Sequence, residues 1–272
     1  MNSFRSEYLK FIYNKWLLLT VLATIILVPL FVIFLHETPS YITEDYVLTQ
    51  ILESFYLGQA GIIIITILFI GQEFNGSTLR SSLLANPTRW KFFFIKLIVI
   101  LSISILVWSL VAFCTICVVY TFYGLLIPLH IYTLALRIIL VSIGLILICF
   151  SLVLITRSIV VPMGMSLSFL LGLGQMLLQF SDAFLYFPII STMNSFFMIE
   201  NQSYIPYTIG IAIQFLWGIL LLSFSILLFR KIKSFDSSCK FSKRTIFKYL
   251  FIDTPPHSRA INYWTSNKKI NN

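Results

Sequence analysis

The sequence predicts an all-α integral membrane protein with six transmembrane helices, and two observations carry that prediction. Composition is the first: 58% of the residues are hydrophobic and only 11% are charged, whereas a soluble protein needs about 25% charged residues. The second is a series of runs without Asp, Glu, Lys or Arg, each about as long as the roughly 20 residues that cross a bilayer as a helix. These runs are 16–35, 54–72, 97–136, 138–156, 158–181 and 201–229.

The placement of basic residues decides how many times the chain crosses, because cytoplasmic loops are enriched in Lys and Arg. We take the spans to lie near 16–35, 54–71, 97–120, 138–156, 159–178 and 207–229. Every Lys and Arg except Arg137 then lies on the side of the two termini. The loops on the other side contain Glu37, Glu44, Asp45, Glu53, Asp182 and Glu200. The prediction is a six-span domain, 1–230, and a basic cytoplasmic tail, 231–272. The chain would be a multi-pass protein of a bacterial cell membrane with both termini cytoplasmic.

Three segments outside the spans have patterns of their own. Near the N-terminus, apolar residues recur at helical spacing, which predicts an interfacial amphipathic helix before the first span; they are Phe4, Tyr8, Phe11 and Ile12. Residues 121–136 contain Gly124 and Pro128, which predict an interfacial cap rather than a continuous helix. Residues 179–206 are apolar but broken by two prolines, Pro188 and Pro206, which predicts an external re-entrant hairpin between spans five and six.

The most informative segment is the polar stretch 71–96, GQEFNGSTLRSSLLANPTRWKFFFIK, which lies between the second and third spans. Ser77 or Thr78 can cap a short helix, and Asn86-Pro87 ends it. Basic residues beyond the proline are expected to hold the third span at the headgroups; they are Arg89, Lys91 and Lys96. From these residues alone, the short helix either docks into a cleft on another protein or lies on lipid.

The order of residues in this segment resembles a pattern in permease subunits of type-2 ABC transporters, most closely those of lantibiotic and bacitracin immunity systems. In this chain the residues that carry the resemblance read E-F-x-G-S-T-L-R-x-x-L-x-x-x-P-x-R from Glu73 to Arg89, followed by an apolar run from Lys96. The resemblance implies a cytoplasmic coupling helix between spans two and three that contacts a separate ABC ATPase. The residues it assigns to coupling are Glu73, Phe74, Gly76, Ser77, Thr78, Leu79, Arg80, Ser81, Pro87 and Arg89.

Several functions lack the residues they need. No G-x-x-x-x-G-K-[ST] loop occurs, so ATP and Mg would be bound by a partner subunit and this chain would need no cofactor. The three histidines are far apart, so no metal site is expected. The net charge of +9 lies at membrane borders, which favours orientation in a lipid bilayer over nucleic-acid binding.

The expected function is the permease subunit of an exporter, not an enzyme, working as a homo- or heterodimer on an amphipathic or hydrophobic cargo such as an antimicrobial peptide. Possible pathway residues are Gln59, Arg137 and Gln175. For Arg137, snorkelling to the outer headgroups is the favoured alternative. One alternative is an ATP-independent secondary carrier, although the spans show neither the intramembrane charges nor the broken helices such carriers use. The other is a non-transporting membrane sensor or scaffold.

Overall fold

The computed structural model describes residues 2–34, 44–74, 89–124, 128–190 and 205–250. The helices account for nearly all of these residues, and no strand occurs among them. Five helices are long and apolar enough to cross a membrane; they are Lys15–Phe34, Tyr46–Phe74, Phe92–Tyr123, Ile131–Thr156 and Tyr207–Leu228. The prediction of an all-helical chain with several possible membrane spans is confirmed. The six-span topology stays a prediction.

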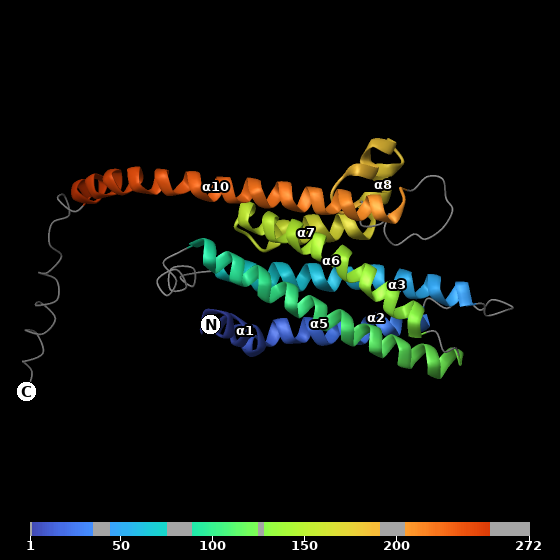
Figure 1. Ribbon diagram of the computed structural model, residues 1–272. Helices are drawn as coiled ribbons and strands as arrows, with labels where there is room; N and C mark the ends of the chain where they lie inside the picture. The colour runs from blue at the N-terminus through green and yellow to red at the C-terminus, as the bar shows by residue number, and fades with distance from the viewer. Residues whose placement is uncertain (1, 35–43, 75–88, 125–127, 191–204, 251–272) are drawn as a thin grey trace, which may run out of the picture. The chain divides into compact units, whose positions relative to one another are not determined.

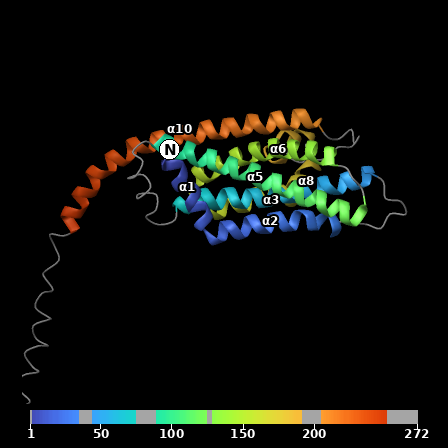
Figure 2. The ribbon, with the colours of Figure 1, turned by 60° about the horizontal axis from the view of Figure 1, so that its bottom comes forward.

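The chain forms two units, Met1–Ser225 and Ile226–Asn272. The predicted boundary between a membrane domain 1–230 and a tail 231–272 stays a prediction. In the first unit, four helices lie side by side (Figures 1 and 2). They are α2 (Lys15–Phe34), α3 (Glu44–Gly71), α5 (Arg89–Tyr123) and α6 (Pro128–Thr156).

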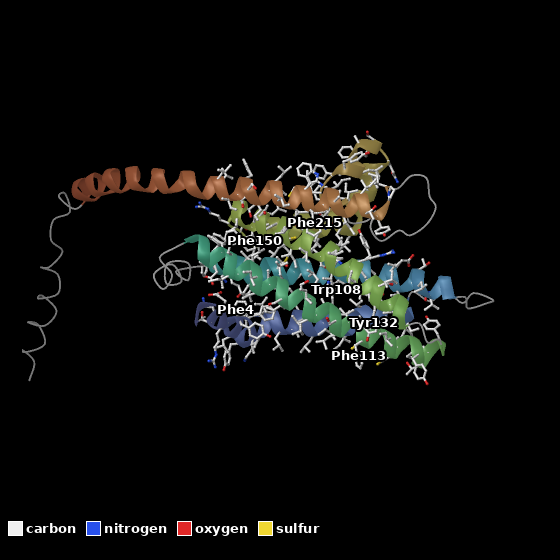
Figure 3. The ribbon with its side chains drawn as sticks, in the orientation of Figure 1. Phe4, Trp108, Phe113, Tyr132, Phe150 and Phe215 are labelled. Atoms are coloured by element: carbon white, nitrogen blue, oxygen red, sulfur yellow. The ribbon has the colours of Figure 1, made fainter. Side chains whose placement is uncertain are left out.

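Small residues let α2 and α3 approach closely, as in other membrane helix pairs. A Cβ atom added at Gly61 would lie 1.7 Å from Thr24 Cγ2, and one at Gly58 would lie 2.7 Å from Val28 Cγ2. Aromatic side chains fill the space between the other helices. Figure 3 shows Trp108 and Phe150 inside the bundle, where they are almost fully buried, while Phe113 and Tyr132 project outward and are more than half exposed. An apolar outer surface of this kind suits a lipid environment.

The helix ends follow local sequence signals. Asn14 separates α1 (Asn2–Tyr13) from α2, and its Oδ1 accepts a hydrogen bond from the backbone N–H of Trp16 at 3.0 Å, as an N-cap does. Gly124 ends α5 with a left-handed φ of 65°, and its N–H donates to the Tyr120 carbonyl at 3.2 Å. The predicted break at Gly124 is confirmed. The expected cap over 121–136 is wrong, because 121–123 belong to α5 and α6 begins at Pro128, a residue suited to the first helical position.

The fifth predicted span, 159–178, is helical but interrupted. It consists of α7 (Val160–Ser168), a π-helical turn η2 (Phe169–Leu173) and α8 (Gly174–Leu178). The Tyr56 hydroxyl of α3 donates a hydrogen bond to the Leu170 carbonyl within the turn, which gives that carbonyl a partner where helical bonding changes. The expectation that the spans contain no broken helix is therefore wrong.

After α8 the chain turns back through the short helix η3 (Asp182–Tyr186), and the Tyr186 carbonyl accepts a hydrogen bond from Trp217 Nε1 at 2.8 Å. Trp217 belongs to α10 (Tyr207–Leu250), which packs on α6 where a Cβ atom at Gly218 would lie 3.0 Å from Leu147 Cβ. The predicted external hairpin falls partly at 191–204, outside the described residues. Its re-entrant position stays a prediction.

Candidate functional site

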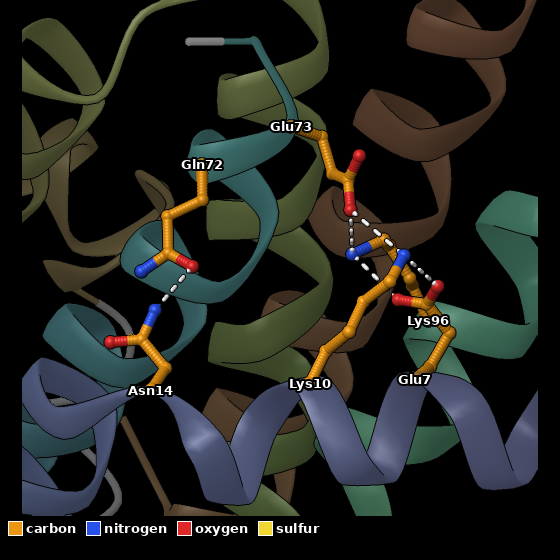
Figure 4. Close-up of polar contacts among 6 residues, drawn as sticks. All are labelled: Glu7, Lys10, Asn14, Gln72, Glu73 and Lys96. Carbon is orange, nitrogen blue, oxygen red and sulfur yellow. Dashed lines mark hydrogen bonds and ion pairs between the residues drawn. The ribbon is translucent and has the colours of Figure 1, made fainter. Parts of the chain in front are cut away.

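The described residues contain one cluster of ion pairs, formed where α1, α3 and α5 meet and buried except for the half-exposed Lys10 (Figure 4). Lys96 Nζ of α5 lies 2.9 Å from Glu7 Oε2 and 2.9 Å from Glu73 Oε1. Lys10 Nζ lies 2.7 Å from Glu7 Oε1 and 3.7 Å from Glu73 Oε1. Two cations and two anions alternate, so the cluster is formally neutral. We call these four residues the ion cluster.

Sequence spacing brings the four residues together. Glu7 and Lys10 are three residues apart and therefore share a face of α1. Glu73 lies in η1 (Gln72–Phe74), the short helix that ends α3, and Lys96 lies two turns into α5. Asn14 fixes the orientation of α1, because its Oδ1 caps α2 while its Nδ2 donates to Gln72 Oε1 at 2.7 Å.

Lys96 lies at the centre of the cluster and has no more than 2% of its side chain exposed. Its Nζ lies 4.4 Å from the ring centroid of Phe69 and 5.3 Å from that of Phe92, so aromatic faces cover the sides that the carboxylates leave open. Phe11 of α1 packs edge-to-face against Phe69 at 5.5 Å between ring centroids. A buried ammonium is tolerated only with such complete compensation.

Glu7 and Lys10 lie on α1, outside the possible membrane spans. Burial tends to raise the pKa of Glu7, but the charges of Lys96 and Lys10 and their hydrogen bonds outweigh it, so the pKa is lowered. Burial tends to lower the pKa of Lys10, but the hydrogen bond and charge of Glu7, with Glu73, outweigh it and the pKa is raised. Both shifts favour the charged forms of Glu7 and Lys10.

Only three of the predicted coupling residues lie among the described residues. Glu73 is buried within the ion cluster, and Phe74 follows it in η1. Arg89 begins α5. The others, Gly76, Ser77, Thr78, Leu79, Arg80, Ser81 and Pro87, lie outside the described residues. The expectation that Lys96 anchors the third span at the headgroups is wrong, since its charge is paired inside the protein.

The possible pathway residues do not come together. Gln59 of α3 is fully buried, and its Oε1 accepts a hydrogen bond from Ser142 Oγ at 3.0 Å. Arg137 of α6 lies over the ring of Tyr207 at 4.3 Å, which provides a cation–π contact for this charge. The backbone of Gln175 belongs to α8, and the position of its side chain lies outside the description.

Glu7 is not among the site residues predicted from the sequence, and Lys96 is predicted at the lipid headgroups instead of in an ion pair. A usable signal was present: within residues 1–230, Glu7 and Glu73 are the two acids that fall outside the predicted external loops, on the side rich in basic residues. The proximity of residues 7, 73 and 96 depends on tertiary packing and cannot be read from their spacing.

No family model, no curated protein and no solved structure matches this chain. Among the described residues, no group of three or more His, Cys, Asp or Glu side chains is placed to hold a metal ion.

Proposed function

We propose that this chain is the membrane-spanning permease subunit of a bacterial ABC exporter, driven by ATP that a separate subunit hydrolyses. The observation that carries the proposal is the Glu73–Lys96 ion pair, at 2.9 Å. These two residues flank the segment 75–88, which contains most of the pattern that resembles a coupling helix. The pair therefore joins the two flanks of the segment that would dock on an ATPase.

The ion cluster gives this segment a mechanical connection to three helices. Displacement of 75–88 would be passed to the end of α3 through Glu73 and to the start of α5 through Lys96. Glu7 and Lys10 add α1, and Asn14 adds the start of α2. Because breaking a buried pair is costly, the three helix ends would move together rather than separately.

The proposed topology has six spans with both termini cytoplasmic. Five come from the long apolar helices, and the sixth from α7, η2 and α8 taken together. Residues 160–178 would be about 28 Å long as a helix, close to the roughly 30 Å of the hydrocarbon core. Protease-accessible tags at both ends test this: cleavage of both only in inside-out vesicles supports it, and cleavage of the two from opposite sides contradicts it.

The proposed cargo is an amphipathic antimicrobial peptide or a similar amphiphile, exported for self-protection, with a second permease copy or a paralogue completing the complex. The test is to determine whether a neighbouring open reading frame encodes a P-loop ATPase, and to co-express that protein with this chain. Copurification and ATP-dependent resistance to a lantibiotic support the proposal. A chain that confers resistance without the ATPase contradicts it.

Two observations favour a second candidate, an ATP-independent secondary carrier. The ion cluster contains buried carboxylates, and the α7–η2–α8 segment is interrupted, and ion-coupled carriers use both features. The two candidates separate in proteoliposomes. A carrier moves cargo with an ion gradient and no ATPase, whereas the exporter requires the ATPase and ATP.

A further inference from the structure

The helix α10 is attached to the bundle differently from α3 and α6. Within the most apolar part of each helix, 67% of the residues of α3 and of α6 are buried, but only 17% of those of α10. Every buried residue in the described part of α10 is small or polar; they are Gly210, Gln214, Gly218 and Ser225. Helices in a bilayer associate through close packing and polar bonds rather than through the hydrophobic effect. The attachment of α10 therefore depends on close contacts at these few residues and on polar bonds.

Gln214 makes the central polar contact between α10 and α6. Its Nε2 donates a hydrogen bond to the Val141 carbonyl at 3.0 Å. The amide reaches α6 because Gly144 carries no side chain: a Cβ atom there would lie 3.0 Å from Gln214 Cγ. One turn before Val141, the cation–π contact of Arg137 with Tyr207, at 4.3 Å, joins the same two helices. Two polar contacts therefore join α10 to α6 within one turn of α6.

The Gln214 amide is only half satisfied in this packed arrangement. Its side chain is fully buried, and Oε1 has no hydrogen-bond partner among the described residues. A carbonyl can only accept, so Val141 fixes Nε2 toward α6 and leaves Oε1 as the unpaired atom. A buried acceptor without a partner lowers stability, because it has given up its hydrogen bonds to water. The residue that joins α10 to α6 therefore keeps an acceptor available for a group that the packed arrangement does not supply.

We propose that α10 is a lateral gate, which separates from α6 during transport and opens the bundle to the bilayer beside Gln214. An N–H group of an amphipathic peptide cargo then donates to Gln214 Oε1 and gives this acceptor the partner it lacks. A cargo dissolved in the bilayer reaches such an opening without passing through water. The inference rests on the proposed transport function, and it applies to an exporter and to a secondary carrier alike.

Distances between spin labels test the motion on the full chain alone, in lipid nanodiscs. The four cysteines are first replaced by alanine. One label is attached at Leu110→Cys of α5, and the second at Leu220→Cys of α10 or, as the matched control, at Leu22→Cys of α2; all three positions are exposed. The α5–α10 pair is expected to show two distances and the α5–α2 pair only one. A single distance of equal width for both pairs would overturn the lateral gate, whether or not an ATPase partner exists.

Gln214→Leu tests the role of the unpaired acceptor in the same spin-labelled chain. The change removes the hydrogen bond and the unpaired acceptor together, so Tm should stay the same or rise. The packed arrangement no longer contains an unsatisfied group, so the population with the longer α5–α10 distance should shrink. A lower Tm together with a larger long-distance population would show that Gln214 only holds α10 in place, and would overturn its proposed role.

Reversible disulfides test whether transport needs the motion. Leu147→Cys with Gly218→Cys joins α6 to α10, and Thr24→Cys with Gly61→Cys joins α2 to α3 as the control. The two pairs are matched, because a Cβ atom at Gly218 or Gly61 lies 3.0 Å from the partner's Cβ, slightly below the roughly 3.5–4.5 Å found in disulfides. Oxidation of the α6–α10 pair should reduce lantibiotic transport in proteoliposomes to background, and dithiothreitol should restore it. The oxidised α2–α3 pair should retain transport.

Two further outcomes separate this inference from the proposed function. Equal transport by the oxidised and reduced α6–α10 pair would overturn the lateral gate and leave the exporter proposal standing. A cysteine-free chain that transports with an ion gradient and no ATPase, and is blocked only by the oxidised α6–α10 pair, would contradict the exporter and support the gate.

Discussion

The two ends of the α2–α3–α5 group are held by different chemistry. At one end, Glu73 and Lys96 form the core of a buried ion cluster that also recruits α1. At the other end, the Tyr123 hydroxyl lies 3.2 Å from the Val32 carbonyl and 3.1 Å from Gln50 Oε1, and Gln50 Nε2 donates to the Tyr46 hydroxyl at 2.7 Å. That second group, which we call the tyrosine clamp, carries no formal charge.

The difference indicates different tasks. A neutral hydrogen bond contributes only about 1 kcal/mol of net stability. A buried ion pair adds little net stability over apolar residues, but removing one member leaves an uncompensated charge and costs several kcal/mol. An ion cluster is therefore poorly explained by stability alone. It suits a joint in which several helix ends must stay in one arrangement or change together.

The largest effect should come from removing the central cation. Lys96→Met keeps the volume but leaves Glu7 and Glu73 without their main partner, so the free energy of unfolding should fall by about 3–5 kcal/mol. Chemical unfolding in detergent micelles measures this. Lys15→Met, at an exposed position in the first turn of α2, is the matched control and should change it by less than about 0.5 kcal/mol. Equal effects of the two changes would contradict a buried, paired Lys96.

A neutral version of the cluster should recover most of that loss. Combining Glu7→Gln, Glu73→Gln and Lys96→Met removes both carboxylates with the buried cation and leaves only Lys10, whose side chain is half exposed. Replacing a buried ionic group by neutral residues of similar volume is often close to neutral in stability. The expected free energy of unfolding is within about 1–2 kcal/mol of the wild-type value. A triple variant with a free energy of unfolding as low as that of Lys96→Met would contradict this expectation. It would show that the ion pairs themselves stabilise this end of the α2–α3–α5 group.

Acid should weaken the ion cluster and not the tyrosine clamp. The folded state lowers the pKa of Glu7 from its ordinary value of 4.5, so this carboxylate contributes its stability fully above that value. The contribution is lost as the pH falls through the lowered pKa. Tm of the wild-type chain should therefore fall more steeply below about pH 4.5 than that of Glu7→Gln. Parallel Tm curves for the two proteins would contradict the paired state of Glu7.

The smallest effect should come from the tyrosine clamp. Tyr123→Phe removes one hydroxyl shared between Val32 and Gln50, and the expected loss is about 1 kcal/mol with no dependence on acid pH. The same unfolding assay measures it. A loss as large as that of Lys96→Met would remove the contrast between the two ends.

Charge-free runs located the possible spans well, because a bilayer sets their length and excludes charge. Single residues were harder. The resemblance identifies Glu73 and predicts a role on a surface that contacts an ATPase, whereas the residue is buried. A lysine at the border of a span, such as Lys96, is typical of a headgroup anchor. Glu7 is not one of the apolar residues that define the amphipathic pattern of the N-terminal helix, so that pattern assigns it no role. Their pairing requires that α1 fold back on α3 and α5, which no local signal specifies.

The interruption of α7, η2 and α8 was missed for a related reason. The run 158–181 carries no charged residue, and glycines such as its Gly172 and Gly174 are common in membrane helices. The Leu170 carbonyl within the interruption accepts a hydrogen bond from the Tyr56 hydroxyl, which lies more than 110 residues earlier in the chain. Such a contact appears only when the helices are packed.

The most direct test of the ion cluster as a joint separates stability from coupling. The triple variant Glu7→Gln, Glu73→Gln, Lys96→Met should be reconstituted with the proposed ATPase subunit, and ATP hydrolysis should be compared with and without a lantibiotic. Tyr123→Phe serves as the control. A folded triple variant whose lantibiotic-stimulated rate falls to the unstimulated rate, while Tyr123→Phe retains stimulation, is the expected result. Full stimulation in the triple variant would contradict the proposal that the ion cluster transmits motion.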